Sequence, residues 1–330
     1  MNKICKLFGI KYPIVQEPVH TLTNGKMIAA ISEAGALGIL GINAGYPLPD
    51  ASSGASSSSS NIVGDPKYSI LDTMTERNLM NEQIDTALEN TFRSFGIEIA
   101  TPYLTPQEDP TASALVALMR KRRLTIAFFE GFGNVASQDW VKLLHSNGIH
   151  VIQRVKNLKQ IKMSIENKID VLIADNLSVL LQIKKFSSSI PVLAGGDLSI
   201  PHEIQEAFLK GADGLFLSTV FLISKEAPTH PQIKQKIIDS STSDLVTIKM
   251  NNENIYSLPG TLPNYLAKLT QQQNNKDKIF DEAHRYQGLI NGMVKNDLYN
   301  GYTKLSKNID FLTKISSTED IVSNLVSIIS

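Results

Sequence analysis

The chain has 330 residues, of which 42% are hydrophobic and 19% are charged. This length exceeds a small single-core domain, and the composition supplies enough apolar material for a large core. Lysine plus arginine and aspartate plus glutamate each total 32, so the formal net charge is zero. Without a net field to hold a phosphate polymer or an anionic bilayer, neither nucleic acid nor a membrane is an expected partner.

The single cysteine, Cys5, excludes an internal disulfide. No activating neighbour can be named for its thiol, so we interpret Cys5 as a small buried residue. The amino terminus has no charged stretch followed by a long apolar run, and no apolar run approaches the roughly twenty residues that span a bilayer. These features predict a cytoplasmic protein.

Short runs rich in Ile, Val, Leu and Phe alternate with longer amphipathic stretches, which is typical of repeated βα units and a parallel sheet. Eight βα units in succession favour a closed (β/α)8 TIM barrel over an open doubly wound sheet. The expected strands are residues 12–19, 37–41, 96–100, 124–129, 150–154, 171–174, 191–194 and 214–217. The expected helices include residues 25–33, 76–92, 112–122, 138–147, 158–166 and 201–210.

Two segments do not fit the repeat. Residues 43–75 include a run, 50–60, with eight serines or glycines among eleven residues, which predicts a long and partly disordered loop. Residues 225–300 follow strand eight and show helical patches, which predicts a small helical subdomain over the barrel mouth. The barrel would then comprise residues 1–224 and 301–330, with a final helix over residues 318–329.

The loops after strands seven and eight are where barrels of this kind often bind phosphate. Gly195 and Gly196 follow strand seven, and paired glycines let backbone amides approach an anion without side-chain interference. Ser218 and Thr219 follow strand eight and offer hydroxyl and amide donors. Gly-Gly is a common turn, but both pairs in the expected places favour a phosphate site.

Several blocks of the sequence resemble the nitronate monooxygenase (2-nitropropane dioxygenase) family, whose relatives include flavin-dependent enoyl-acyl carrier protein reductases. The blocks are GIKYPIVQ at 9–16, AAISEAGALGILG at 29–41, FGI at 95–97, PVLAGG at 191–196, KGADG at 210–214, TVFL at 219–222, and His230-Pro231. Residues 291–301 and 317–325 resemble the family's carboxyl-terminal tail, so the resemblance runs from end to end.

The resemblance implies an FMN-dependent oxidoreductase that oxidises a small nitronate-like substrate or passes electrons from NAD(P)H through the flavin. A homodimer is one option for its assembly. The phosphate would lie at Gly195, Gly196, Ser218 and Thr219. The ring would lie over the barrel mouth, near the ends of the strands. There it would face Gln16, Glu17, Pro18, Val19, Glu98, Asp175, Phe216 and Leu217.

The chain departs from the family's pattern in three places. Glu98 stands where the family has an asparagine, and Ser218 stands in the place of a glycine after strand eight. Residues 174–178 read Ala-Asp-Asn-Leu-Ser, so the family's catalytic histidine is absent. His20, which follows strand one and would face the mouth, is the best substitute as general acid or base; the other interpretation is a hydrogen-bonded loop histidine.

Acidic residues gather at the predicted mouth and leave other functions open. Glu17, Glu98, Glu130, Asp175 and Asp197 fall at or after strand ends, where they could hold a divalent cation or lie scattered around the ring. We favour scattered carboxylates and expect no metal. The alternative functions are a barrel that binds a phosphate-bearing ligand without turnover, an enoyl-acyl carrier protein reductase, and a metal-dependent enzyme of sugar phosphates or nucleotides.

Overall fold

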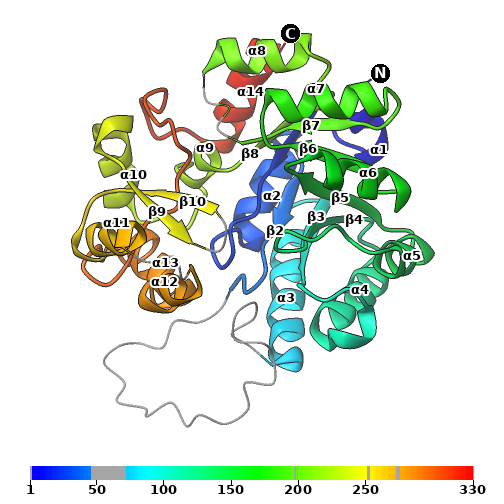
Figure 1. Ribbon diagram of the computed structural model, residues 1–330, viewed down its shortest axis with the longest axis horizontal. Helices are drawn as coiled ribbons and strands as arrows, with labels where there is room; N and C mark the ends of the chain where they lie inside the picture. Colours follow the sequence, from blue (N-terminus) through cyan, green and yellow to red (C-terminus); the bar gives the residue numbers. More distant parts are fainter. Residues whose placement is uncertain are drawn as a thin grey trace.

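Eight parallel strands form the centre of the protein. The computed structural model describes residues 2–45, 72–196, 198, 200–250, 253–272 and 276–329, so most of the loop predicted at 43–75 lies outside the described residues. The strands are β1 (Ile14–Gln16), β2 (Gly38–Leu40), β3 (Phe95–Ala100), β4 (Ile126–Glu130), β5 (His150–Val155), β6 (Val171–Ala174), β7 (Val192–Ala194) and β8 (Gly214–Leu217). All eight expected strands are present (Figure 1).

The sheet closes on itself. Neighbouring strands pair in the order β1-β8-β7-β6-β5-β4-β3-β2, and a parallel bridge between Val15 and Leu37 joins the two ends. The side chain of Gln16 completes this seam, because its Oε1 accepts a hydrogen bond of 2.9 Å from the Ile39 backbone N–H and its Nε2 donates to the Glu17 carbonyl. The predicted (β/α)8 barrel is confirmed.

Helices follow the strands around the outside of the barrel. They are α2 (Gly25–Glu33), α3 (Thr73–Leu88), α4 (Pro110–Arg122), α5 (Gln138–Ser146), α6 (Leu158–Glu166), α7 (Leu177–Phe186), α8 (Pro201–Leu209), α9 (Thr219–Leu222) and the last helix, α14 (Thr318–Ile329). The helices expected from the sequence did not include α7, the short α9 or the first helix, α1 (Lys3–Phe8). None of the helices in these described ranges is both long and apolar enough to cross a membrane.

The barrel has two apolar layers. Inside it, alternate residues of the strands pack together, among them Phe128 and Phe216, whose ring centroids lie 5.3 Å apart. Helix α1 joins this inner layer through Ile4, Cys5 and Phe8 and covers the amino-terminal end of the strands. Cys5 is buried, as expected, and burial raises the pKa of its thiol.

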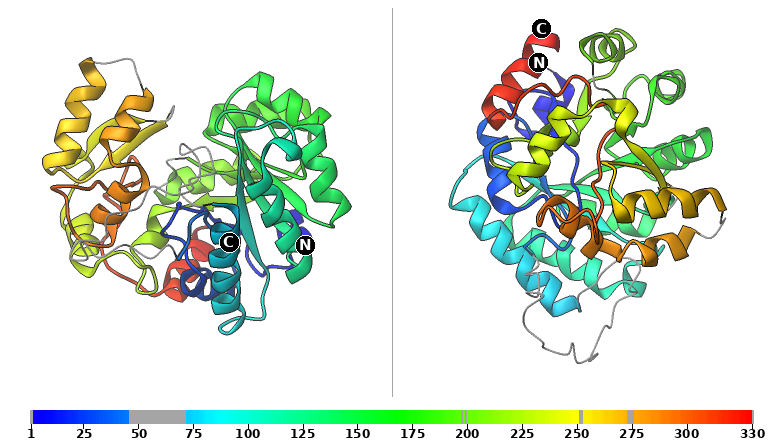
Figure 2. Two further views of the ribbon diagram at one scale, coloured as in Figure 1. Left: turned by 90° about the horizontal axis from the view of Figure 1, so that it is seen from below. Right: turned by 90° about the vertical axis from the view of Figure 1, so that its left-hand side faces the viewer.

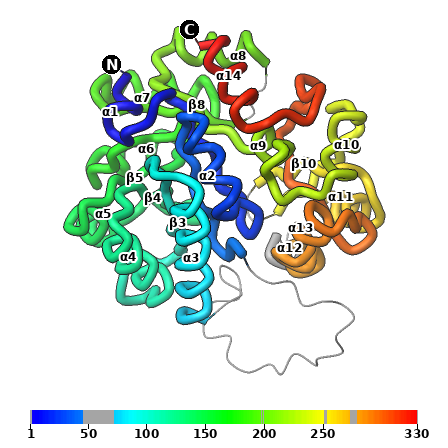
Figure 3. Tube along the Cα trace, turned by 180° about the vertical axis from the view of Figure 1, so that it is seen from behind, coloured from blue at the N-terminus to red at the C-terminus, as the bar shows by residue number. Residues whose placement is uncertain are grey.

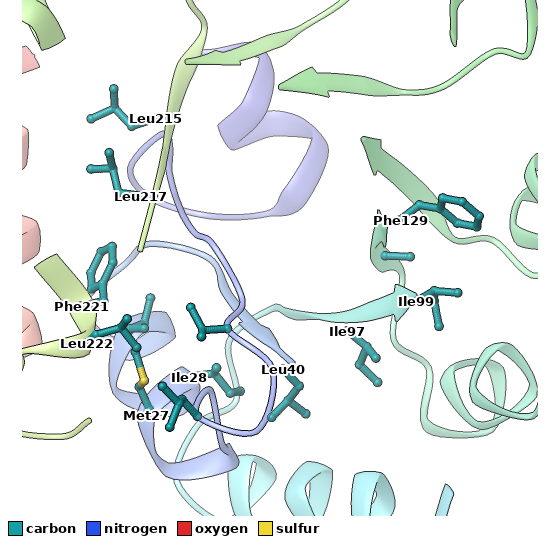
Figure 4. Packing of buried hydrophobic residues seen from close by; sticks show 14 of the residues in the cluster. Met27, Ile28, Leu40, Ile97, Ile99, Phe129, Leu215, Leu217, Phe221 and Leu222 are labelled. Atoms are coloured by element: carbon teal, nitrogen blue, oxygen red, sulfur yellow. The ribbon is translucent and has the colours of Figure 1, made fainter. Parts of the chain in front are cut away.

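The outer layer lies between strands and helices. Figure 4 shows part of it, where Ile97 and Ile99 of β3 and Leu215 and Leu217 of β8 lie on the outer faces of their strands. Met27 lies on the face of α2 that packs against the barrel. Because successive strand residues point to opposite faces, residues next to these outer ones must face the barrel interior. This alternation decides which polar residues reach the mouth.

The chain after β8 forms a second body beside the barrel, which we call the subdomain. It contains α10 (Pro231–Asp239), β9 (Val246–Met250), β10 (Glu253–Ser257), α11 (Thr261–Gln272), α12 (Lys276–Glu282) and α13 (Arg285–Met293). These elements lie together on one side in Figure 1 and from behind in Figure 3, and in front of the barrel in the right-hand view of Figure 2.

The antiparallel β9–β10 hairpin was not expected from the sequence, where the subdomain was predicted to be helical. Each hairpin strand is short, and its alternation is carried by few residues: Ile248, Met250 and Ile255 are buried, while Thr247, Lys249 and Asn254 are exposed. Helices precede and follow the hairpin in the chain. In the sequence, its two five-residue strands therefore look like polar loops that connect helices.

Replacing Gln16 by Met tests its role in the seam. The change keeps the side-chain volume but removes the acceptor for the buried Ile39 N–H, which should lower the free energy of unfolding by about 1–3 kcal/mol. Chemical denaturation without added cofactor measures this. The same replacement at exposed Gln138 is the control and should change stability little. Equal losses of stability in the two variants would show that the Gln16 side chain does not stabilise the closure of the barrel.

Candidate active site

The mouth of the barrel carries a ring of charged residues that strand alternation places there. Glu98, Glu130 and Arg154 lie in β3, β4 and β5, two residues beyond glycine or apolar residues of the barrel interior. Glu17 and Asp175 follow β1 and β6 with the same spacing from Val15 and Ile173. The carboxyl ends of parallel strands meet at one end of a barrel, so these five side chains converge.

Arg154 is the centre of this ring. Its Nη2 lies 2.6 Å from Glu17 Oε1 and its Nη1 lies 2.5 Å from Asp175 Oδ1, so it joins β5 to the ends of β1 and β6. Its guanidinium carbon lies 5.4 Å from the centroid of the Phe216 ring. Burial acts to lower the pKa of Arg154, but the two carboxylates outweigh burial and the pKa is raised, so the side chain stays charged.

His20 and Glu98 form a second pair at the mouth. His20 Nε2 lies 2.8 Å from Glu98 Oε1, and Glu98 Oε2 accepts a hydrogen bond of 3.1 Å from the Ile42 N–H. The His20 ring packs edge-to-face on Tyr286 of α13, with centroids 5.1 Å apart. Glu98 is buried and His20 is only partly exposed, so the carboxylate fixes the orientation of the imidazole.

A cavity of about 190 Å³ lies between the mouth and the subdomain, and we call it the mouth cavity. Among its lining residues are polar and aromatic groups from both bodies. The barrel contributes Glu17, Pro18, Val19, His20, Glu98, Phe128, Phe129, Glu130, residues 131–134, Gln153, Arg154, Lys156 and Gln160. The remainder of the lining comprises Met250, Glu253, Ile255, Phe280, Tyr286, Leu289, Tyr302 and Lys304.

Glu253 of β10 connects the subdomain to the barrel. Its carboxylate lies 3.6 Å from Lys156 Nζ, beyond β5, and 3.5 Å from Lys304 Nζ. Lys304, followed by Lys156 and Arg154, lowers the pKa of Glu253 to about 2 against the opposing effect of burial. This carboxylate therefore stays ionised across the range in which enzymes work.

A second cavity, of about 230 Å³, lies beyond the end of β8, and we call it the β8 cavity. It is lined by Ser218 and Thr219, by Lys314, and by apolar side chains of α8, α9 and α14. Among its described lining residues no carboxylate is present, so its charge suits an anion. Glu17 N donates a hydrogen bond of 2.8 Å to Leu217 O, so one lining residue of each cavity is paired with the other across the ends of β1 and β8.

Of the predicted phosphate residues, Ser218 and Thr219 line the β8 cavity, whereas Gly195 and Gly196 are not among its lining residues. The Thr219 hydroxyl lies 2.8 Å from that of Ser306 and accepts a hydrogen bond from the Ser306 N–H. At Gly196, whose φ is +82°, a Cβ atom would lie 2.2 Å from Asp175 O, so the tight turn after β7 requires glycine. Gly195 N–H donates to Ala174 O.

The remaining predicted site residues are divided among three places. Glu17, Pro18, Val19, His20 and Glu98 line the mouth cavity, and Asp175 reaches its edge through Arg154. Phe216 lies below Arg154 in the barrel interior, and Leu217 lines the β8 cavity. Gln16 lies in the β1–β2 seam and does not line either cavity. Asp197 lies outside the described residues.

The acidic residues of the mouth point to different partners. Glu17 and Asp175 bind Arg154, Glu98 binds His20, and Glu130 accepts a hydrogen bond of 2.7 Å from the Phe132 N–H. Within the ranges that the structure describes, no group of three or more His, Cys, Asp or Glu residues is arranged to hold a metal ion.

Comparison with known proteins decides the family. The family model for nitronate monooxygenase matches residues 2–327. The chain belongs to the nitronate monooxygenase family. A probable nitronate monooxygenase of Staphylococcus aureus (strain MSSA476) is 22% identical over 93% of this chain and 88% of its own length. One of Bacillus subtilis (strain 168) is 24% identical over 84% and 91%. The resemblance seen in the sequence is confirmed.

Solved structures share the fold. FabK from Thermotoga maritima superposes with a TM-score of 0.76 at 20% identity, covering 100% of this chain and 96% of its own. Nitroalkane oxidase from Streptomyces ansochromogenes gives 0.74 at 15% identity, covering 99% and 97%. Membership of the family makes the protein an oxidoreductase and implies a flavin cofactor.

Glu76 of α3 lies behind the His20–Glu98 pair in a dry environment. It is 2% exposed, and its Oε1 accepts a hydrogen bond of 2.9 Å from the Asn43 N–H. Its Oε2 and both side-chain polar atoms of Asn43 are buried without a hydrogen-bond partner in the described part of the chain. Burial raises the pKa of Glu76 to about 7, with the Asn43 bond and His20 opposing it and Glu98 adding to it.

This pKa predicts a pH-dependent stability. Because the folded-state value of about 7 lies above the unfolded value, Glu76 destabilises the fold as the pH rises from about 4.5 to 7, by about 3 kcal/mol in total. Glu76→Gln should remove this loss, so that the variant becomes the more stable protein at pH 8. Denaturation of wild type and variant at about pH 4.5 and at pH 8 measures this change in stability. Glu82→Gln, at an exposed site, is the control. Parallel curves for wild type and Glu76→Gln would contradict the prediction.

Proposed function

We propose that the protein is an FMN-dependent oxidoreductase whose substrate binds in the mouth cavity and whose proton transfers are made by His20. The observation that carries the proposal is the adjacency of two different cavities across the β1–β8 pair. One contains an oriented histidine, and the other is free of carboxylates among its described lining residues.

The β8 cavity fits the phosphate end of the cofactor. Ser218 and Thr219 would supply donors there, together with the N–H of Gly196 in the turn after β7, and Lys314 would supply a positive charge. The ring would extend from the end of β8 toward Arg154. When bound, the flavin supplies the transfer of electrons in pairs, and the protein supplies orientation and charge. Glu17 would not repel a reduced anionic ring, because its charge is compensated by Arg154.

His20 is suited to hold and move a proton. With Glu98 as the acceptor at Nε2, the tautomer that carries hydrogen on Nε2 leaves Nδ1 as a base, and Nδ1 makes no hydrogen bond to the described residues. His20 lines the cavity where a substrate would bind. A carboxylate that orients an imidazole is the arrangement used by many general bases. His20 would thus replace the histidine that the chain lacks after β6.

Two classes of electron donor are consistent with this site. The first is a small nitronate-like substrate that is oxidised directly, and the second is NAD(P)H, from which electrons pass through the flavin to an acceptor. Anaerobic reduction of the purified protein by propyl nitronate, NADH or NADPH, followed by the loss of the visible flavin bands, identifies the donor. A protein that stays colourless after incubation with FMN and desalting would instead be a barrel that binds its ligand without redox turnover.

The phosphate position is tested by comparing FMN with riboflavin, which lacks the phosphate. Lys314→Ala should raise the Kd for FMN roughly threefold to tenfold and leave that for riboflavin unchanged, since an exposed lysine contributes a modest charge-assisted contact. Fluorescence titration of the flavin measures both constants. Lys142→Ala, on the exposed side of α5, is the control. An equal rise in the Kd for FMN and for riboflavin would show that the phosphate does not bind in the β8 cavity.

The role of His20 is tested by turnover at constant flavin content. His20→Asn should reduce kcat by about a hundredfold or more, and Glu98→Gln by less, because it keeps a side chain of the same shape but no charge. Steady-state rates with the donor found above give both values. His150→Asn, beside Asp170 at the opposite end of β5, is the matched control. Full turnover in His20→Asn would exclude it as the proton-transfer group.

A further inference from the structure

Two lysines of the mouth cavity face one carboxylate. Lys156 follows β5 and Lys304 lies in the segment after α13, while Glu253 is the first residue of β10. Lys156 Nζ lies 3.6 Å from Glu253 Oε1, and Lys304 Nζ lies 3.5 Å from Glu253 Oε2. Each ammonium group therefore faces its own oxygen of the same carboxylate. We call Lys156 and Lys304 the lysine pair.

The lysine pair carries more charge than Glu253 compensates. Across the described ranges, Glu253 is the one carboxylate within 4.0 Å of either ammonium group, so two positive charges share one negative charge. Burial acts to lower the pKa of Lys304, but Glu253 and Glu17 outweigh burial and the pKa is raised, so the side chain stays charged. One positive charge of the lysine pair thus remains for an anionic ligand.

The contacts between the lysine pair and Glu253 can exchange at small cost. Both distances exceed the roughly 2.7–2.9 Å that is usual for a hydrogen bond between an ammonium group and a carboxylate. The three side chains are 37–42% exposed, and ion pairs with this access to water contribute little to stability. The Glu253 side chain can therefore turn toward water and leave both ammonium groups to another anion.

The Glu253 carboxylate also shows which anion fits between the two lysines. It is planar, it carries one negative charge, and it presents one oxygen to each ammonium group. A nitronate group has the same charge and likewise two oxygens on one planar centre, as does the carboxylate of a small organic acid. His20 lines the same cavity of about 190 Å³, so an anion held by the lysine pair shares this small space with the histidine.

We propose that Lys156 and Lys304 form the receptor for a planar two-oxygen anion of the substrate, a nitronate or a carboxylate group, and that Glu253 is the internal group that competes for this receptor. The anion would exchange with the Glu253 carboxylate, whose side chain turns outward. The proposal names the residues that determine specificity in the function proposed above and rests on that function only for the reaction. Binding of the anion requires neither the flavin nor His20.

Three probes of the same planar shape and different charge test the proposal: benzoate, benzamide and benzamidinium. Ligand-observed NMR titration of the wild type should give a Kd for benzoate roughly threefold to tenfold below that of either other probe. Lys156→Gln and Lys304→Gln should each raise the Kd for benzoate by a similar factor and leave that for benzamide unchanged. Lys159→Gln, at an exposed site of α6 that does not line the cavity, is the matched control.

Glu253→Gln should have the opposite effect on the same probe. The change removes the competing charge and keeps the shape of the side chain, so the Kd for benzoate should fall roughly threefold to tenfold while that for benzamide stays the same. A damaged fold would not bind benzoate more tightly, so this result separates competition from a structural role of Glu253. If a lysine variant does not fold, Glu253→Gln and the three probes on the wild type decide.

The outcomes separate this inference from the proposed function. Tightest binding of benzamidinium, equal binding of the three probes, or weaker binding of benzoate in Glu253→Gln would each overturn the inference. Propyl nitronate and butyrate, added in competition, show which of the two groups displaces benzoate; displacement by neither would also overturn it. A colourless protein whose lysine pair binds benzoate would refute the redox function alone. A flavoprotein that propyl nitronate reduces, but that shows no preference for benzoate, would refute the inference alone.

Discussion

The bridge from Arg154 to Glu17 and Asp175 is the interaction on which the mouth of the barrel depends. It ties the ends of three strands together, and it places a permanent positive charge above the Phe216 ring, where the packed interior ends. Removing either carboxylate would leave Arg154 with less compensation, and removing Arg154 would leave two carboxylates close together. Such partly buried ionic groups stabilise little by themselves, but each partner is costly to lose. The positions of His20, Glu98 and Glu130 are arranged around this fixed centre.

Much of the barrel could be predicted from the sequence for a physical reason. Strands of a parallel barrel are covered on both sides, so they appear as continuous apolar runs, and all eight were found in this way. Glu17, Glu98, Glu130 and Asp175 were expected at the mouth because they fall at or after strand ends. Arg154 was not, although it lies near the end of β5, two residues after buried Ile152, with the same spacing from an interior residue.

The contribution of the segments that follow β8 could not be predicted in this way. Glu253, Tyr286 and Lys304 reach the mouth cavity from segments whose sequences show no relation to the barrel repeat, and only the folded chain brings them to His20 and Lys156. For Gln16, the sequence suggested a different contact from the one that the structure shows. Its position at the end of the family-like block at 9–16 suggested a role toward the cofactor, whereas its side chain joins β1 to β2. Sequence spacing locates a strand end, but it does not say which neighbour a polar side chain will bind.

Helix α1 has a consequence for how small molecules would reach the proposed site. Because it covers the amino-terminal end of the strands, and packed side chains fill the interior above it, the described part of the barrel offers no path to the mouth cavity from that end. In the function proposed above, a compound that gives electrons and a compound that takes them would both approach from the mouth. Sharing one space of about 190 Å³ would make them bind in turn rather than together.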